Sequence, residues 1–137
     1  MMTTKHHLYL FVLVLFVASF FLTGCSQGPN TAHVTGVVTI DGETVEGVQL
    51  RFSPVSRERS SMGYTDANGR YLLRFTETET GCIPGDHVVR ITAYRDPDND
   101  MSQFLPIRYN EAADENEEMN ITVKKGRQEV NFSLTSE

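Results

Sequence analysis

Between positions 33 and 134, apolar and polar side chains alternate with a period of two residues in most of the segments that are rich in apolar residues. The pattern is clearest at Val48, Leu50 and Phe52, which are separated by polar residues. A period of two places successive side chains on opposite faces of an extended strand. No segment of this region shows a convincing helical period. The alternation therefore predicts short strands that bury one face.

Seven or so such strands, separated by closely spaced turn signals, favour an antiparallel seven-stranded β-sandwich, preceded by an N-terminal signal helix. Asp41–Gly42 predicts a tight reversal, and Asp66–Gly69 predicts a hairpin. A second hairpin is expected across Lys124–Gly126. The alternating residues are Val34, Gly36, Val38 and Ile40; Val48, Leu50 and Phe52; Met62 and Tyr64; Tyr71, Leu73 and Phe75; His87, Val89, Ile91 and Ala93; Met119, Ile121 and Val123; and Val130, Phe132 and Leu134.

Three aspartates, Asp96, Asp98 and Asp100, lie in a polar segment that we expect to be a loop without a core, like the acidic loop that ends at Glu118. Alternating carboxylates open the calcium loop of an EF-hand. Met101 stands where that loop needs glycine, and Ile107 where it needs glutamate, which excludes an EF-hand. A looser calcium site and a set of solvated charges remain as alternatives. Further carboxylates for such a site would be Asp114, Glu115, Glu117 and Glu118.

An apolar run from Leu8 to Phe21 follows Lys5 and ends in the sequence Leu22-Thr23-Gly24-Cys25. The run is short for a permanent membrane helix and has the form of an export signal. The junction resembles the lipobox of bacterial lipoproteins, which reads leucine, a small residue, glycine or alanine, then cysteine. A conventional secretory signal and an uncleaved membrane helix are the alternatives.

The lipobox resemblance implies cleavage before Cys25, diacylglycerol on its sulfur and often an acyl chain such as palmitate on the new amino terminus. Residues 1–24 would be the removed signal peptide, 25–32 a tether and 33–137 the domain. In this family Ser26 favours the outer membrane, with the domain in the periplasm or at the cell surface of a bacterial envelope. One acyl chain binds only marginally, so two or three are needed for a lasting anchor.

Removal of residues 1–24 leaves 137 − 24 = 113 residues, one domain's worth. Only Lys5 is lost among the charges, so 11 basic and 18 acidic residues give a net charge near −7. Such a surface repels phosphate backbones, which argues against a nucleic-acid partner. With Cys25 acylated, Cys82 has no partner in the chain and is expected to be a small buried residue rather than a reactive thiol. Without acylation, a Cys25–Cys82 disulfide would be an alternative.

Three segments together resemble the carboxypeptidase regulatory-like domains, which have a transthyretin-like (prealbumin-like) sandwich. The resemblance spans His33 to Leu134, and it implies a structural, stabilising or binding module. Cys82 and His87 depart from the family pattern, which has an ordinary apolar residue and an aromatic residue there. The segments are 34–38 with 41–42 and 45–48, then 65–71, then 81–89; the stretches 105–110 and 131–134 resemble small lipoproteins of planctomycete-like bacteria.

Enzymatic patterns are missing from the mature sequence. His33 and His87 are its only histidines, they fall on different predicted strands, and no zinc-ligand spacing or GxSxG motif occurs. Some transthyretin-like proteins hydrolyse hydroxyisourate and end in Tyr-Arg-Gly-Ser, whereas this chain ends in 135–137, Thr-Ser-Glu. We expect His87 to be a core residue, and no catalytic residue, cofactor or metal is predicted.

The sequence thus predicts a lipid-anchored envelope protein with one non-catalytic interaction or structural module. Its partner would be an unknown envelope protein or glycan. The alternative is a calcium- or carbohydrate-binding surface module. Tyr64, Tyr94 and Tyr109 would supply flat contacts for a partner, but we expect them to cap the core.

Overall fold

The computed structural model describes residues 30–96 and 100–137. The strands are β1 (His33–Ile40), β2 (Glu43–Thr44), β3 (Gln49–Pro54), β4 (Ser61–Tyr64), β5 (Arg70–Leu72), β6 (Gly85–Thr92), β7 (Tyr94–Asp96), β8 (Asp100–Gln103), β9 (Asn120–Val123), β10 (Arg127–Glu129) and β11 (Phe132–Leu134). Three single 3₁₀ turns follow β8: η2 (Ile107–Tyr109), η3 (Ala113–Glu115) and η4 (Glu117–Met119).

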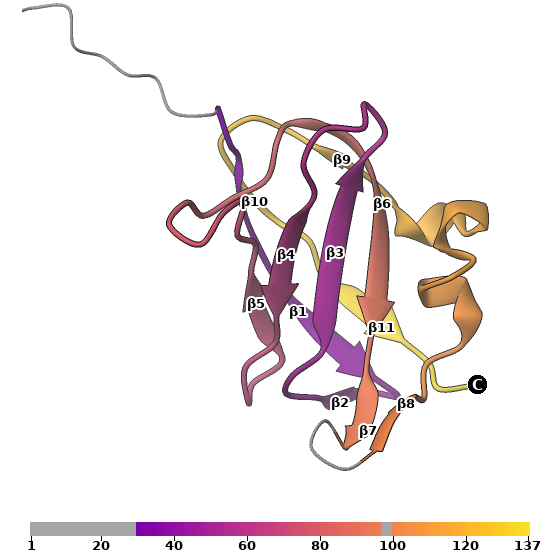
Figure 1. Ribbon diagram of the computed structural model, residues 1–137. Coiled ribbons are helices and arrows are strands. Elements are labelled where there is room, and N and C mark those ends of the chain that lie inside the picture. Colours follow the sequence, from indigo (N-terminus) through magenta and orange to yellow (C-terminus); the bar gives the residue numbers. More distant parts are fainter. Residues whose placement is uncertain (1–29, 97–99) are drawn as a thin grey trace, which may run out of the picture.

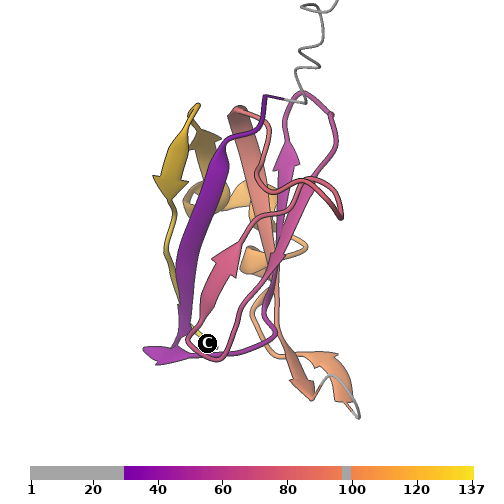
Figure 2. The same ribbon diagram turned by 90° about the vertical axis from the view of Figure 1, so that its left-hand side faces the viewer.

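Two sheets pack face to face and form an all-β sandwich, as the alternation predicted (Figure 2). One sheet has the order β4-β3-β6-β9 and is antiparallel throughout. In the other sheet β1 is central, with β10 and β11 on one edge and β5 and β2 on the opposite edge. In Figure 1 the β4-β3-β6 face is turned to the viewer, and β1 lies behind it.

The core lies between the sheets, and most of its residues are those that the alternation placed on the inner faces. On β4 the expected face was wrong, because Ser61 and Gly63 are buried there and Met62 and Tyr64 are not. Phe52 of β3 is fully buried and brings both sheets into contact. Its ring centroid lies 6.4 Å from that of Tyr71 and 6.3 Å from that of Phe132, both from the opposite layer, and 6.1 Å from that of His87 on β6. Edge and tilted contacts of this kind add to the stabilisation from burial alone.

The prediction of seven antiparallel strands was wrong in two respects: the number of strands, and the direction of the last strands relative to β1. The described part of the chain has eleven strands, because β7 and β8 form a hairpin in the expected polar loop and because the short strands β2 and β10 lie outside the alternating runs. β1 pairs in parallel with β10 and β11. Alternation defines the faces of a strand but does not specify its neighbours or their direction.

The expected closing hairpin between residues 119–123 and 130–134 does not form. β9 pairs with β6 in one sheet, and β11 pairs with β1 in the other. The turn at Gly126, which has a φ of 97°, therefore carries the chain from one layer to the other. The carbonyl of Gly126 accepts a hydrogen bond of 2.8 Å from the amide of His33, which fixes the start of β1 beside this turn.

The predicted hairpin around Asp66–Gly69 is likewise divided between the layers. β4 pairs with β3, and β5 pairs with β1. The turn itself forms as expected, since Asp66 Oδ1 accepts bonds from the amides of Asn68 and Arg70 and Gly69 has a φ of 70°. One isolated bridge, between Met62 and Arg74, still links the two segments.

The acidic loop that ends at Glu118 does contribute to the core, contrary to expectation, because Ala113 is fully buried. Leu105 and Tyr109 before it and Met119 after it are buried as well. The 3₁₀ turns η2 to η4 pack along β6, seen at the right of Figure 1. Turns of three residues each are too short to produce a helical period, so the sequence pattern concealed this packing.

Candidate functional site

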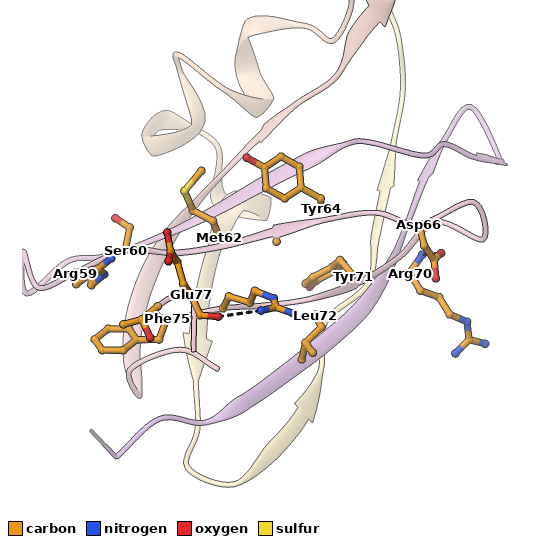
Figure 3. Close-up of a pocket in the computed structure, with 13 residues that line it drawn as sticks. Arg59, Ser60, Met62, Tyr64, Asp66, Arg70, Tyr71, Leu72, Phe75 and Glu77 are labelled. Atoms are coloured by element: carbon orange, nitrogen blue, oxygen red, sulfur yellow. Dashed lines mark hydrogen bonds between the residues drawn. The ribbon is translucent and has the colours of Figure 1, made fainter. Parts of the chain in front are cut away.

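A cleft with a volume of about 600 Å³ opens where the edge strand β4 meets β5 (Figure 3). It exists because β4 and β5 belong to different sheets and are joined only at the Met62–Arg74 bridge. Apolar surface predominates in the lining, with contributions from Met62, Tyr64 and Phe75. Met62 and Tyr64 project from the same side of β4.

Charged side chains surround this apolar floor. Three arginines and two carboxylates line the cleft, namely Arg59, Arg70, Arg74, Asp66 and Glu77. The cleft therefore carries a small positive excess, although the whole chain has a formal net charge of −6. The guanidinium of Arg59 lies 5.9 Å from the centroid of the Phe75 ring, and Arg74 donates to the carbonyl of Glu77 at 3.2 Å.

The three tyrosines considered in the sequence differ in exposure. Tyr109 caps the core as expected, with an exposed fraction of 4%, and its hydroxyl lies 3.3 Å from Oγ1 of Thr135. Tyr94 is half-buried. The expectation was wrong for Tyr64, which is 60% exposed at the rim of the cleft because its position on β4 points away from the core. Its hydroxyl accepts a hydrogen bond of 2.9 Å from Gln49.

A second site candidate is the buried pair of Cys82 and His87, whose Sγ and Nε2 atoms lie 3.2 Å apart. Cys82 is fully buried, and its backbone forms two hydrogen bonds with Ala32. His87 is 1% exposed on β6. Nδ1 of His87 lies 3.0 Å from the carbonyl of Gly85. A carbonyl can only accept, so Nδ1 carries the proton and Nε2 accepts from the thiol.

The protonation states of this pair follow from burial. Burial raises the pKa of the Cys82 thiol to about 11, and the nearby hydroxyl of Ser61 acts weakly in the opposite direction. Burial also lowers the pKa of His87, against the smaller effects of the Gly85 carbonyl and of Asp86 and Glu58. Both groups are therefore neutral at pH 7. A nucleophilic cysteine requires a lowered thiol pKa, so this pair has the opposite electrostatics.

Cys82 and His87 are thus buried core residues, as the sequence predicted for each. That they contact each other was missed. The available signal was that the two residues that differ from the pattern of the resembled domains flank a single turn, five positions apart. Their hydrogen bond joins that turn to β6, and the two backbone bonds between Cys82 and Ala32 hold the Ala32 segment against the turn.

The buried imidazole makes stability depend on pH. Because the pKa of His87 is lowered on folding, the unfolded chain binds more protons below its ordinary pKa of about 6.5, and stability falls as the pH drops through that value. We expect the urea concentration at the unfolding midpoint of the wild type to decrease as the pH is lowered from about 7.5 to 5.5. His87→Gln should be less stable by about 1 to 3 kcal/mol at the higher pH, with a flatter dependence.

His33→Gln is the matched control, because His33 is half-buried at the start of β1 and outside the pair. It should keep the pH dependence of the wild type. If the urea midpoint of the wild type depended on pH no more steeply than that of His87→Gln, the assignment of a buried neutral imidazole would be contradicted.

The predicted lipid-attachment residue, Cys25, lies outside the described residues, as does the signal segment 1–24. Of the expected tether 25–32, the last residue belongs to the folded part: Ala32 is fully buried, and Oγ1 of Thr31 donates to the carbonyl of Thr80 at 3.2 Å. Cys82 is a free thiol.

The calcium candidates are only partly described. Asp96 and Asp100 are paired positions of the β7–β8 hairpin, and Asp98 lies outside the described residues. Within residues 30–96 and 100–137, no group of three or more His, Cys, Asp or Glu side chains has a metal-binding arrangement. Asp114 instead faces Arg90, with 3.7 Å between carboxylate and guanidinium.

Within the same described ranges, no helix has the length and apolar character needed to cross a membrane.

Comparisons with protein-family models, with curated proteins and with solved structures give no match to this chain.

Proposed function

We propose that this protein is a bacterial envelope lipoprotein, anchored through Cys25, whose sandwich is a non-catalytic binding module of the transthyretin-like type. The resemblance of residues 22–25 to a lipobox supports the anchor. The turns of the three segments that resemble carboxypeptidase regulatory-like domains support the fold type, because Gly42, Gly69 and Gly85 all have positive φ values in the structure.

The observation that carries the binding role is the cleft between β4 and β5. It combines a mostly apolar lining with charged and polar groups at its rim. Pockets with an apolar floor and a few polar groups are the usual form of binding sites. Tyr64 at the rim offers an amphipathic ring of the kind enriched at interfaces.

The neutral state of the Cys82–His87 pair supports the non-catalytic part of the proposal. A thiol with a pKa near 11, fully buried and bonded to a neutral imidazole, is protected from substrate and lacks a thiolate. Its role is to hold the entry of the chain against β6.

The position of Ala32 sets how far the module can stand from a membrane. Ala32 follows Cys25 by seven positions in the sequence. Even a fully extended segment of that length spans at most about 25 Å. A module on so short a tether would meet partners at the membrane surface.

Site-specific photocrosslinking tests the binding role. A photoreactive amino acid in place of Tyr64, in bacteria that make the full chain, should yield discrete crosslinked products because the ring lies at the cleft rim. The matched control is the same substitution at Ser133, which is exposed on β11 in the other sheet. Crosslinks of equal pattern and yield from both positions, or none from position 64, would refute the cleft as the binding surface.

A further inference from the structure

The exposed face of the β4-β3-β6 sheet carries two arginines side by side. Arg51 of β3 and Arg90 of β6 are direct cross-strand partners. Like charges at directly opposed positions destabilise a sheet. Two adjacent arginines are unfavourable for folding, and an exposed position readily accepts another residue. Their presence on this surface therefore suggests a role in binding.

The two arginines differ in their partners. Arg90 lies 3.7 Å from the carboxylate of Asp114, whose side chain is 60% exposed. Arg51 is exposed, and among the residues that the structure describes its side chain has no hydrogen bond or ion pair. A guanidinium presents a planar fork of donors that matches a carboxylate with two parallel hydrogen bonds. The fork of Arg51 is thus available to an external anion.

Apart from Met62, the other side chains that line the pocket around the pair are neutral and polar. Arg51 and Arg90 line a pocket of about 290 Å³ together with Gln49, Thr92 and Asn110. The amide of Asn110 donates to the hydroxyl of Thr92 at 2.9 Å, which fixes its orientation. Amides and hydroxyls of this kind pair readily with sugar hydroxyls.

Tyr64 completes one side of this face. It is the cross-strand partner of Gln49, and its hydroxyl accepts from Gln49 Nε2 at 2.9 Å. The polar pocket adjoins the cleft, because Met62 lines both. One continuous surface therefore carries two guanidinium groups, amides that can bind hydroxyls, and an exposed aromatic ring.

We infer that this surface, Gln49, Arg51, Tyr64, Arg90, Thr92 and Asn110, binds an acidic glycan, with a uronic acid carboxylate held by Arg51 and Arg90. The inference rests on the proposed function, since it names the ligand class of the binding module. Charge complementarity supports it: a positive face on a chain with a net charge of −6 selects an anion at this place. A polyphosphate backbone of high charge density would be repelled by the rest of the surface.

Calorimetric titration of the full mature chain with an oligomer of galacturonic acid tests the inference. We expect binding that weakens with added salt, and no binding of a neutral galactose oligomer of the same length. Arg51→Gln should weaken binding at least about tenfold, because a charge-assisted bidentate contact is lost. Arg51→Lys should give an intermediate affinity, because it keeps the charge and loses the fork.

Arg127→Gln is the matched control, with the same change of charge at an exposed position of β10 in the other sheet. It should leave the affinity unchanged. Equal losses in Arg127→Gln and Arg51→Gln, no binding by the wild type, or equal binding of an oligoglutamate peptide would each overturn the inference. Crosslinking from position 64 to a protein, without glycan binding, would leave the proposed function standing and remove only the ligand class.

Discussion

Replacing Gly36 with alanine is expected to lower the free energy of unfolding by about 3 kcal/mol or more. Gly36 is the middle of β1, and a Cβ atom there would lie 1.8 Å from the carbonyl oxygen of Val130 and 2.8 Å from Cε1 of Tyr71. Contacts this short do not occur between non-bonded atoms, so the backbone would have to move.

The Val130 carbonyl cannot easily move away, because two hydrogen bonds hold this peptide segment. The hydroxyl of Tyr71 donates to the Val130 carbonyl at 2.6 Å, and the Val130 amide donates to the Thr35 carbonyl at 2.8 Å. The segment lies where β10 gives way to β11 along the edge of β1. Displacing it would disturb the parallel pairing of both strands with β1.

Urea denaturation of purified Gly36→Ala measures the loss. Val37→Ala is the matched control, because it changes the next, half-buried residue of the same strand. It should cost about 1 kcal/mol, as expected for partial loss of a half-buried apolar side chain. A Gly36→Ala variant as stable as this control would contradict the close packing of residue 130 on β1.

The sequence predicted the inner faces of most strands, since burial of one face is a local property of each strand; β4 is the exception, because Met62 and Tyr64 lie on its outer face. Val48, Leu50 and Phe52 are all fully buried, as their spacing indicated. It failed at Met119–Val123 and Val130–Leu134, where the shortest connection suggested a hairpin. The two runs enter different sheets, because β9 pairs with the edge of β6 and β11 pairs with the edge of β1. Which strand edges are open to pairing is a property of the whole fold.

The site was less accessible to sequence reasoning than the fold. The cleft depends on β4 and β5 entering different sheets, and no local pattern encodes that division. The Arg51–Arg90 pair depends on the register of two strands far apart in sequence. Cys82 and His87 were each placed correctly in the core, but their contact depends on the geometry of the turn at Gly85, which has a φ of 136°.

Replacing Cys25 with serine is expected to abolish membrane attachment. The proposed thioether requires the cysteine sulfur, and a serine hydroxyl does not form it. Each buried methylene contributes about 0.8 kcal/mol to membrane binding, so loss of two or three acyl chains removes almost all of the affinity. Incorporation of labelled palmitate and sedimentation with membranes should both be lost.

Cys82→Ser is the matched control for this change, because it removes the only other cysteine. Its hydroxyl can still donate to Nε2 of His87, so the fold should persist. The control should keep both palmitate label and membrane attachment. Label that persists in Cys25→Ser and disappears in Cys82→Ser would refute the assignment of the anchor.

The central claim is that a lipid on Cys25 presents the sandwich at a bacterial membrane, and the intact mass of the protein extracted from such membranes tests it most directly. The account predicts a chain that begins at Cys25, lacks residues 1–24 and carries the added mass of a diacylglyceryl group, with or without a further acyl chain. An unmodified mass, or a chain that retains residues 1–24, would contradict it.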